Sequence, residues 1–348
     1  MHFLIPDNKI INKISFIILL LVVSCSSQKF TVSDHCDGER FFNTKKDLPK
    51  KNKGDYKKWR EEQKLRPAWP ETVVNTITPN IHSEIDSGKI AVTLINHATV
   101  LVQTKEVTFI TDPIFSNTAG PLNIVGTKRV RAPSFEISQL PKIDLVLVSH
   151  NHYDHMDIRS MKKLRRKFDP LFVVPLGNKK FLKSKGFKNV IELDWWQEQT
   201  ISDKIKVALA PALHWSKRKL RDNMKTLWGS FIVFSGTQKI YFAGDTGYDF
   251  HFKNIYDKYG AMDVSLLPTG AYEPRWFMKN FHMNPEESVR AHTELRSKFS
   301  FGYHWGTFRL TDEEYYAPQK DLKNALQKLL LPKTTFLTPD FGETIVFP

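Results

Sequence analysis

The hydrophobic positions of the chain fall into a polar first quarter and a long remainder in which short apolar segments recur. From Ile90 onward these segments are rich in β-branched residues and are separated by turn-like interruptions. Short runs of this composition predict β-strands, and the closely spaced runs 90–95, 99–103 and 107–111 predict consecutive antiparallel strands. Further strands are predicted at 144–149, 171–175, 190–193, 205–210, 230–234, 239–243, 263–267 and 343–347.

Helices are predicted between these groups of strands. Residues 157–168 place Ile158, Met161 and Leu164 on one face and a run of Lys and Arg on the other, which is typical of an amphipathic helix with a solvated basic face. Asn284-Pro285 followed by two acidic residues predicts a helix start. Shorter helices are predicted near 179–185 and 320–331. Strand groups with helices between them, repeated in two halves, predict two packed sheets with helices outside.

The amino terminus has the pattern of an export signal. Lys9 and Lys13 flank the start of an apolar run at 14–23 that is too short to span a bilayer, which takes about 20 helical residues. A basic start, a short apolar stretch and small residues predict a lipoprotein-type signal peptide at 1–24. Residues 22–25 resemble a bacterial lipobox, which implies a protein exported to the bacterial cell envelope and membrane-anchored through lipidated Cys25. The alternative is a buried strand or helix at the start of the fold.

Residues 25–85 are polar and basic, and they predict a tether followed by an N-terminal arm that lies across a main domain at 86–348. Cys25 and Cys36 are the only two cysteines, which excludes a disulfide scaffold and a Cys-rich zinc site. Lipidation of Cys25 leaves Cys36 without an intramolecular partner, so a free thiol is expected there. Any metal site must use carboxylates and some of the 12 histidines.

The composition predicts a globular chain with anionic partners. A length of 348 residues, with 41% hydrophobic and 12% aromatic residues, supplies ample material for a buried core and excludes disorder of the bulk. The 51 Lys and Arg against 37 Asp and Glu give a net charge of +14. This excess favours nucleic acid, phospholipid headgroups or phosphorylated metabolites as partners, and charge alone does not choose among them.

A group of metal-ligating side chains follows the apolar strand at 144–149. His150, His152, Asp154 and His155 place three imidazoles and one carboxylate close together, and these ligand types suit Zn²⁺. Burial of so much polarity without a metal would cost free energy. The spacing therefore predicts a metal site, and a sharp turn after the strand would let neighbouring residues point to two metal ions.

Three further residues stand at predicted strand ends, namely His214, Asp245 and His304. Each is unremarkable alone, since single buried or surface histidines are common and Asp245 could be an ordinary turn residue. Gly244 and Gly247 beside Asp245 permit a tight turn that aims its carboxylate. The joint occurrence of the three at strand ends predicts that they join the metal site.

The order His-x-His-x-Asp-His, His, Asp, His resembles the metallo-β-lactamase superfamily of binuclear metallohydrolases. This resemblance implies an α/β (α+β) fold, a metallo-β-lactamase-like αββα four-layer sandwich with its site at one edge of the two sheets. Within the superfamily, the chain resembles the N-acylphosphatidylethanolamine-hydrolysing phospholipase D family over roughly residues 90–310. The segments that carry this similarity are 97–102, 111–116, 150–157, 193–196, 214–216, 226–230, 243–248, 270–278 and 304–308.

The resemblance implies two zinc ions per chain, and the residues leave iron and manganese open as substitutes. One ion would be held by three histidines and the other by two histidines and a carboxylate, with one aspartate bridging both. The first set is His150, His152 and His214; the second is Asp154, His155 and His304; the bridge is Asp245. The absence of a cysteine among them argues against the cysteine-containing β-lactamase type.

Three other residues acquire roles from the same resemblance. It implies that Asp112 supports catalysis from behind the ligands, orienting a ligand histidine or a bound water. It also implies that Tyr153 and His282 contact the substrate phosphate, although Phe281 departs from the polar residue expected before His282. Residues 276–278 predict either an apolar rim beside the site or part of the core.

The function implied is that of a zinc-dependent phosphodiesterase of the phospholipase D type. Two zinc ions about 3.5–4 Å apart can share a hydroxide and contact both oxygens of a displacement. This hydroxide would attack phosphorus in N-acyl phosphatidylethanolamine and release phosphatidic acid and an N-acylethanolamine. The expected partners are the phospholipid substrate and a membrane surface, without nucleic acid, and family analogy implies a homodimer. No side chain is an unambiguous general acid for the leaving group.

Alternatives stay open at the level of sequence. One is a lactonase or another phosphodiesterase of the same fold that acts on a soluble metabolite, which predicts no benefit from lipid dispersions. A nuclease would exploit the net charge of +14, but export away from cytoplasmic RNA counts against it. A non-catalytic lipoprotein binding module is disfavoured by the complete ligand set and would contain no stoichiometric metal.

Overall fold

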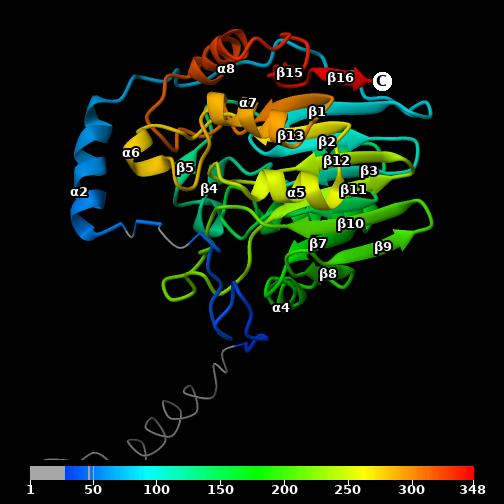
Figure 1. Ribbon diagram of the computed structural model, residues 1–348, viewed down its shortest axis with the longest axis horizontal. Helices are drawn as coiled ribbons and strands as arrows, with labels where there is room; N and C mark the ends of the chain where they lie inside the picture. The colour runs from blue at the N-terminus through cyan, green and yellow to red at the C-terminus, as the bar shows by residue number, and fades with distance from the viewer. Residues whose placement is uncertain (1–27, 46–47, 50) are drawn as a thin grey trace, which may run out of the picture.

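The computed structural model describes residues 28–45, 48–49 and 51–348 (Figure 1). The predicted signal peptide at 1–24 and the predicted lipidation site Cys25 lie outside the described residues. Within the described part of the chain, every helix is too short or too polar to cross a bilayer.

The first sheet has seven strands in the order β16-β1-β2-β3-β6-β7-β8. Strands β16, β1, β2 and β3 pair antiparallel, whereas β3, β6, β7 and β8 pair parallel. The predicted antiparallel arrangement of the first three strands is thereby confirmed. The strands are β1 (Ile90–Asn96), β2 (Thr99–Gln103), β3 (Thr108–Thr111), β6 (Leu145–Leu147), β7 (Leu171–Pro175), β8 (Val190–Leu193) and β16 (Thr344–Phe347).

The second sheet repeats this plan in the order β15-β14-β13-β12-β11-β10-β9. Strands β9 to β12 pair antiparallel, and β12 to β15 pair parallel. Both halves of the chain therefore begin with antiparallel strands and continue with parallel ones. The strands are β9 (Glu198–Ser202), β10 (Ile205–Ala210), β11 (Ser230–Ser235), β12 (Gln238–Phe242), β13 (Val264–Pro268), β14 (Phe299–Tyr303) and β15 (Phe336–Leu337).

Helices cover the outer face of each sheet. On the first sheet, Met161 and Leu164 of α3 and Leu182 of α4 share an apolar cluster with residues of β7; on the second, residues of α5, α7 and α8 share another cluster with Tyr241 of β12. Between the sheets lies a third apolar cluster that includes Phe109 and Phe231. These layers confirm the expected αββα sandwich. The helices are α3 (Ile158–Phe168), α4 (Lys179–Ser184), α5 (His251–Tyr259), α7 (Pro285–Glu294) and α8 (Ala317–Lys328).

The N-terminal arm contains a helix, α2 (Lys53–Glu62), which the sequence pattern did not predict. A capping box between Asn52 and Asp55 begins it, and it stands beside α6 (Arg275–Met278) (Figure 1). Trp59 of α2 stacks on Phe277 of α6, with ring centroids 4.7 Å apart. Since α2 buries no residue completely, it lacks the apolar stripe that makes a helix recognisable in a sequence.

The earlier part of the arm packs into the main body. Phe41 and Cys36 are each 1% exposed and belong to the apolar cluster between the sheets. Among the described residues, Cys36 is buried and forms no disulfide, and the expected free thiol stays a prediction because Cys25 lies outside them. A hydrogen bond from the amide of Phe41 to the carbonyl of Met224 ties the arm to the loop after β10.

Candidate active site

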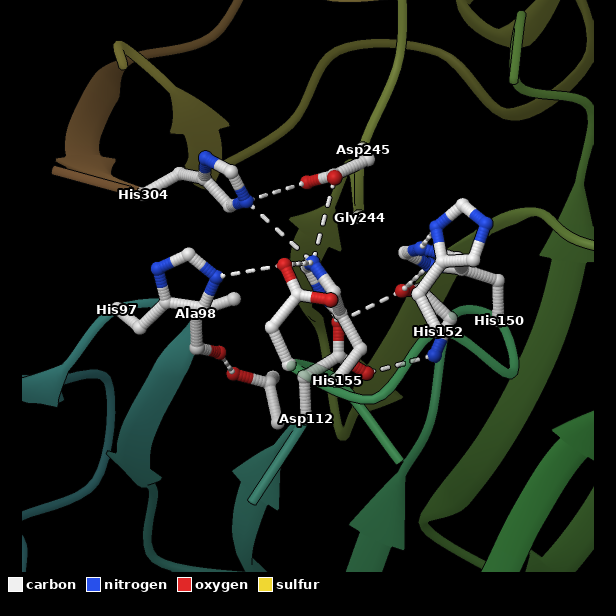
Figure 2. Close-up of polar contacts among 12 residues, drawn as sticks. His97, Ala98, Asp112, His150, His152, His155, Gly244, Asp245 and His304 are labelled. Carbon is white, nitrogen blue, oxygen red and sulfur yellow. Dashed lines mark hydrogen bonds and ion pairs between the residues drawn. The ribbon is translucent and has the colours of Figure 1, made fainter. Parts of the chain in front are cut away.

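All seven predicted ligands follow strands, and the fold brings these strand ends to one place. The loop after β6 carries His150, His152, Asp154 and His155 in the first sheet. In the second sheet, His214 follows β10, Asp245 follows β12 and His304 follows β14. Figure 2 shows the labelled side chains pointing toward one another from both sheets.

One group of side chains surrounds His155. Its Nε2 lies 3.4 Å from Asp154 Oδ2, 3.2 Å from Asp245 Oδ2 and 3.3 Å from His304 Nε2. His304 Nε2 in turn lies 3.1 Å from Asp245 Oδ1. These residues are the ones expected to share one ion and its bridging carboxylate.

A second group contains the other three histidines. His152 Nδ1 lies 2.7 Å from His150 Nε2 and 3.4 Å from His214 Nε2. His214 Nε2 is 3.8 Å from Asp245 Oδ2, so Asp245 contacts both groups. His150, His152 and His214 offer nitrogen atoms that all lie within 4.8 Å of one another, the spacing of a single coordination sphere.

The backbone around the site is held in left-handed conformations. Asp112 has φ 33° and His304 has φ 68°, values uncommon for residues other than glycine. Gly244, before Asp245, has φ +62°, and a Cβ at this position would lie 2.6 Å from Cβ of Ser149. Glycine is therefore required there on two counts, and such strained positions concentrate where a fold holds functional groups in place.

Asp112 orients His155 from behind. It is completely buried and lies 2.7 Å from His155 Nδ1 through Oδ2, while Ser149 donates to it through its amide at 2.7 Å and its hydroxyl at 2.6 Å. A carboxylate accepts hydrogen bonds, so His155 Nδ1 carries the proton and Nε2 faces the cluster. This is the arrangement by which a carboxylate fixes the ring and tautomer of a metal-ligating histidine.

Burial and mutual charge set the protonation of the cluster. Burial lowers the pKa of His152 to about 4 and the pKa values of His150 and His214 well below their usual value, which leaves neutral imidazoles. Burial alone would raise the pKa values of Asp154 and Asp245, but contact with His155 outweighs burial and holds both well below their usual range. His150, His152 and His214 thus present neutral nitrogens beside the ionised carboxylates of Asp154 and Asp245.

These residues fit divalent metal ions. Burial disfavours charge on His155, yet Asp245, Asp154 and Asp112 together raise its pKa well above the usual value, so the site favours a positive charge among three carboxylates. His150 and His152 direct ring nitrogens at each other at 2.7 Å, and neutral imidazoles in that position gain from a shared cation. Nitrogen and carboxylate ligands of this kind suit zinc and related metals.

His97 belongs to the cluster and was not predicted as a site residue. It follows β1 with φ 45°, and its Nε2 lies 3.1 Å from Asp154 Oδ2. Burial lowers its pKa to about 3, so the ring is neutral and donates to the carboxylate. The rule that found His214 and His304, a histidine directly after a strand, would also have found His97.

The two predicted substrate contacts differ in placement. His282 lies beside the cluster, with Nδ1 3.9 Å from Asp245 Oδ2, and it lines the pocket into which the cluster opens. Tyr153 points away, since its hydroxyl donates to the carbonyl of Arg218 at 2.9 Å and its ring lies under the Arg218 guanidinium. Contact of Tyr153 with a phosphate therefore stays a prediction that requires a change of rotamer.

The cluster opens into a pocket of about 1040 Å³, here named the active-site pocket. His152, Asp154, His214, Asp245 and His282 lie on one side of it. The N-terminal arm and α6 supply much of the remaining wall. The basic and apolar residues in the wall include Lys45, Leu48, Lys51, Tyr56, Trp59, Trp215, Lys217, Phe277, Met278 and Phe281.

Comparisons with known proteins agree with this architecture. Residues 108–305 match the family described as beta-lactamase superfamily domain. The chain is 38% identical over 283 residues to N-acyl-phosphatidylethanolamine-hydrolyzing phospholipase D 1 of Caenorhabditis elegans, covering 78% of this chain and 79% of that protein. The chain belongs to this phospholipase D family of the beta-lactamase superfamily. The mitochondrial relative of Saccharomyces cerevisiae, also named as such a phospholipase D, is 38% identical over 226 residues, covering 62% of this chain and 47% of the yeast protein.

Solved structures share the fold of this family member at low sequence identity. Igni18, a metallo hydrolase from Ignicoccus hospitalis, superposes with a TM-score of 0.57 at 21% identity and covers 75% of this chain and 99% of that one. An isothiocyanate hydrolase from Delia radicum gut bacteria gives a TM-score of 0.58 at 19% identity and covers 73% and 98%. Together with the family match, the fold and the relatives identify a metal-dependent hydrolase.

Proposed function

We propose that this hydrolase is a zinc-dependent phosphodiesterase of the phospholipase D type, which cleaves N-acyl phosphatidylethanolamine to phosphatidic acid and an N-acylethanolamine. The observation that carries the proposal is the position of the His/Asp cluster, which lies directly on a large pocket with lysines and apolar side chains in its other walls. A phosphodiester with acyl chains needs both features in one cavity.

The lysines in the pocket supply positive charge where the phosphate would lie. Lys51 Nζ stands 3.5 Å from the centroid of the Phe277 ring, and burial lowers its pKa to about 8. Among the described residues, it forms no ion pair with a carboxylate within 4 Å. A partly desolvated ammonium is stabilised by an anionic ligand, and a phosphodiester provides one.

The apolar wall suits acyl chains. Phe277 and Met278 are 4% and 7% exposed and line the pocket, while Trp276 is 38% exposed. Phe277 and Met278 are therefore buried as core residues are and also line the pocket, so both interpretations of 276–278 apply to them. Tyr56 and Trp59 of the arm pack on Phe277 and extend this wall. Pockets for lipid-like ligands are lined in this way, with a few polar groups that fix orientation.

The roles of the chain's own residues follow from their contacts. Divalent ions, when bound, would polarise the phosphoryl oxygens and supply an activated water. Two sets of side chains would hold them, His150, His152 and His214 in one and Asp154, His155 and His304 in the other, with Asp245 shared. Asp112 and His97 keep His155 and Asp154 oriented. His282 and Lys51 would position the phosphate beside the cluster, and water would protonate the departing alkoxide to give the N-acylethanolamine.

The test is hydrolysis of N-acyl phosphatidylethanolamine dispersions, with products identified by mass spectrometry. The zinc-loaded enzyme should release phosphatidic acid and N-acylethanolamine, and a chelator should stop it. Asp245→Asn should lose turnover, whereas the exposed control Asp257→Asn on α5 should keep it. Turnover of lactones or soluble phosphodiesters alone, with no lipid hydrolysis, would favour the soluble-metabolite alternative.

We also propose that Cys25 carries a lipid anchor, on the strength of the sequence pattern. Gln28, three residues later, is the first described residue, and the arm that follows reaches the active-site pocket through Asp34. A lipid anchor before this arm would keep the enzyme at the membrane that holds its substrate. Cys25→Ser should move the protein out of the membrane fraction of the producing cells, and an unchanged distribution would oppose the anchor.

A further inference from the structure

A small hairpin beside the two main sheets exposes apolar side chains. Strands β4 (Thr118–Ala119) and β5 (Thr127–Lys128) form a separate two-stranded ladder. The connecting residues 120–126, here named the hairpin tip, expose Leu122, Ile124 and Val125 by 80%, 72% and 68%. Three large aliphatic side chains so exposed within four positions form an unusual surface for a soluble domain.

The exposure is built into the hairpin tip. Gly120 and Gly126 face each other at its base, where a Cβ on Gly120 would lie 1.7 Å from the Val125 carbonyl oxygen and a Cβ on Gly126 2.1 Å from that of Ala119. Asn123 points inward instead and donates from its side-chain amide to Thr118 O at 3.3 Å and to Asp157 Oδ1 at 3.2 Å. The backbone is thereby fixed with its polar residue inside and its aliphatic residues outside.

A basic loop lies next to the hairpin tip. Residues 217–221, here named the basic loop, expose Lys217, Lys219 and Arg221 together with Leu220, which is 95% exposed. Arg218 points inward and holds the loop in place, donating to the carbonyls of Asn151 and Met156. Among the described residues, the side chains of Lys219 and Arg221 form no ion pair.

The two segments border one depression, which adjoins the active-site pocket. Pro121 of the hairpin tip and all of the basic loop line a surface pocket of about 850 Å³. Trp215 and Lys217 line both this pocket and the active-site pocket. The N-terminal arm contacts the residues just after the basic loop. The amide of Phe41 donates a hydrogen bond to the carbonyl of Met224, and the Arg40 side chain donates one to the carbonyl of Asn223.

We propose that the hairpin tip and the basic loop together dock on an anionic phospholipid bilayer. The aliphatic side chains of the hairpin tip, held on a fixed backbone, would enter the boundary between headgroups and acyl chains. The lysine and arginine side chains of the basic loop would be attracted to the anionic headgroups. Docking here places the active-site pocket beside the headgroups. The inference rests on the proposed function in assigning a membrane phospholipid as the substrate, and it names the surface that reaches it.

The experiment detects contact of the hairpin tip with vesicles through a fluorophore on the tip, and it does not depend on hydrolysis. An environment-sensitive fluorophore is attached to Ile124→Cys, and, as a matched control, to Leu330→Cys, since Leu330 is 91% exposed and lies two residues after the end of α8. Both variants carry Cys25→Ser, and Cys36 is buried, so the new thiol is the reactive one. With vesicles containing phosphatidylglycerol, the probe at 124 should brighten several-fold and shift to the blue, while the probe at 330 should stay unchanged.

Charge reversal completes the test. Lys219→Glu with Arg221→Glu should weaken the vesicle response about tenfold or more, and high salt should weaken that of the parent. Hydrolysis of a water-soluble phosphodiester should be unaffected by the charge reversal, since neither residue lines the active-site pocket, so failure of docking is separable from failure of the catalytic proposal. A probe at 124 that stays in water while the protein binds vesicles would overturn the inference. A vesicle-independent shift that grows with protein concentration would overturn it in favour of self-association.

Discussion

His97 links the two sheets at the active site through His304. Its Nε2 lies 3.1 Å from Asp154 Oδ2, and its backbone carbonyl accepts the amide of His304 at 2.9 Å. Asp154 belongs to the loop after β6 of the first sheet and His304 to the end of β14 of the second. His97 thus fixes the position of the Asp154 carboxylate relative to the backbone of His304.

The first prediction follows from this link. His97→Ala should reduce metal affinity and kcat/KM by about 10–100-fold, the usual cost of removing a group that orients a ligand. His97→Asn, which tolerates φ 45° and retains a donor, should recover part of the loss. Titration of the metal-free protein with zinc measures the effect. The control is His292→Ala, another buried histidine away from the cluster, which should keep zinc affinity. Equal zinc affinity in His97→Ala and the parent would contradict the positioning role.

The second prediction concerns the carboxylate behind His155. Asp112→Asn keeps the shape but removes the negative charge that the buried His155 Nδ1 contacts at 2.7 Å. Zinc affinity should fall about 10–100-fold. Asp144→Asn is the control, because Asp144 also accepts a backbone amide, from Thr108, but lies away from the cluster. Isothermal titration of both variants gives the comparison, and an unchanged Asp112→Asn would remove Asp112 from the account.

The third prediction concerns Lys51 and alkaline pH. Because burial lowers its pKa to about 8, Lys51 loses its charge as the pH rises through that value, and KM for an anionic lipid should rise there. Lys51→Arg stays charged, so it should abolish the rise in KM at alkaline pH. Lys51→Met should raise KM at every pH below about 8, with the zinc content unchanged. Lys53→Met, an exposed neighbour on α2, should match the parent. A KM profile of Lys51→Met that keeps the alkaline rise would exclude Lys51 as its source.

The fourth prediction concerns acid stability of the metal-free protein. Burial lowers the pKa of His292 to about 4 from 6.5, so between these values the unfolded chain binds a proton that the folded chain does not. Stability therefore falls as the pH drops from 6.5 toward 4, and this one group contributes about 2 kcal/mol of loss by pH 5. His292→Gln should reduce by about that amount the difference between urea unfolding at pH 7 and pH 5. An undiminished difference would mean that His292 is protonated in the folded state.

Much of the fold and of the cluster was predictable because its signals are local. Strand runs such as 205–210 alternate with turns, and Asn284-Pro285 begins α7 where predicted. The predicted ligands come together as expected because each follows a strand and the carboxyl ends of these strands meet at one edge of the two packed sheets; their role as ligands stays a prediction. The same reasoning extended to His97 would have completed the cluster.

The rest depends on contacts that no local pattern reveals. Helix α2 has no fully buried face, and its Trp59 finds its partner Phe277 far along the chain. Its contribution to the active-site pocket was therefore not predictable from periodicity. Tyr153 lies in the predicted loop, yet its hydroxyl direction is decided by Arg218, which is 65 positions away. Backbone position followed from sequence, whereas side-chain direction followed from tertiary packing.

The most direct test of the metal centre is anomalous diffraction at the zinc edge from crystals of the zinc-loaded protein. The account predicts two peaks in the cluster. One should lie among His150, His152 and His214, the other among Asp154, His155 and His304, with Asp245 contacting both. A single peak, or zinc bound only at other histidines such as His251, would contradict it.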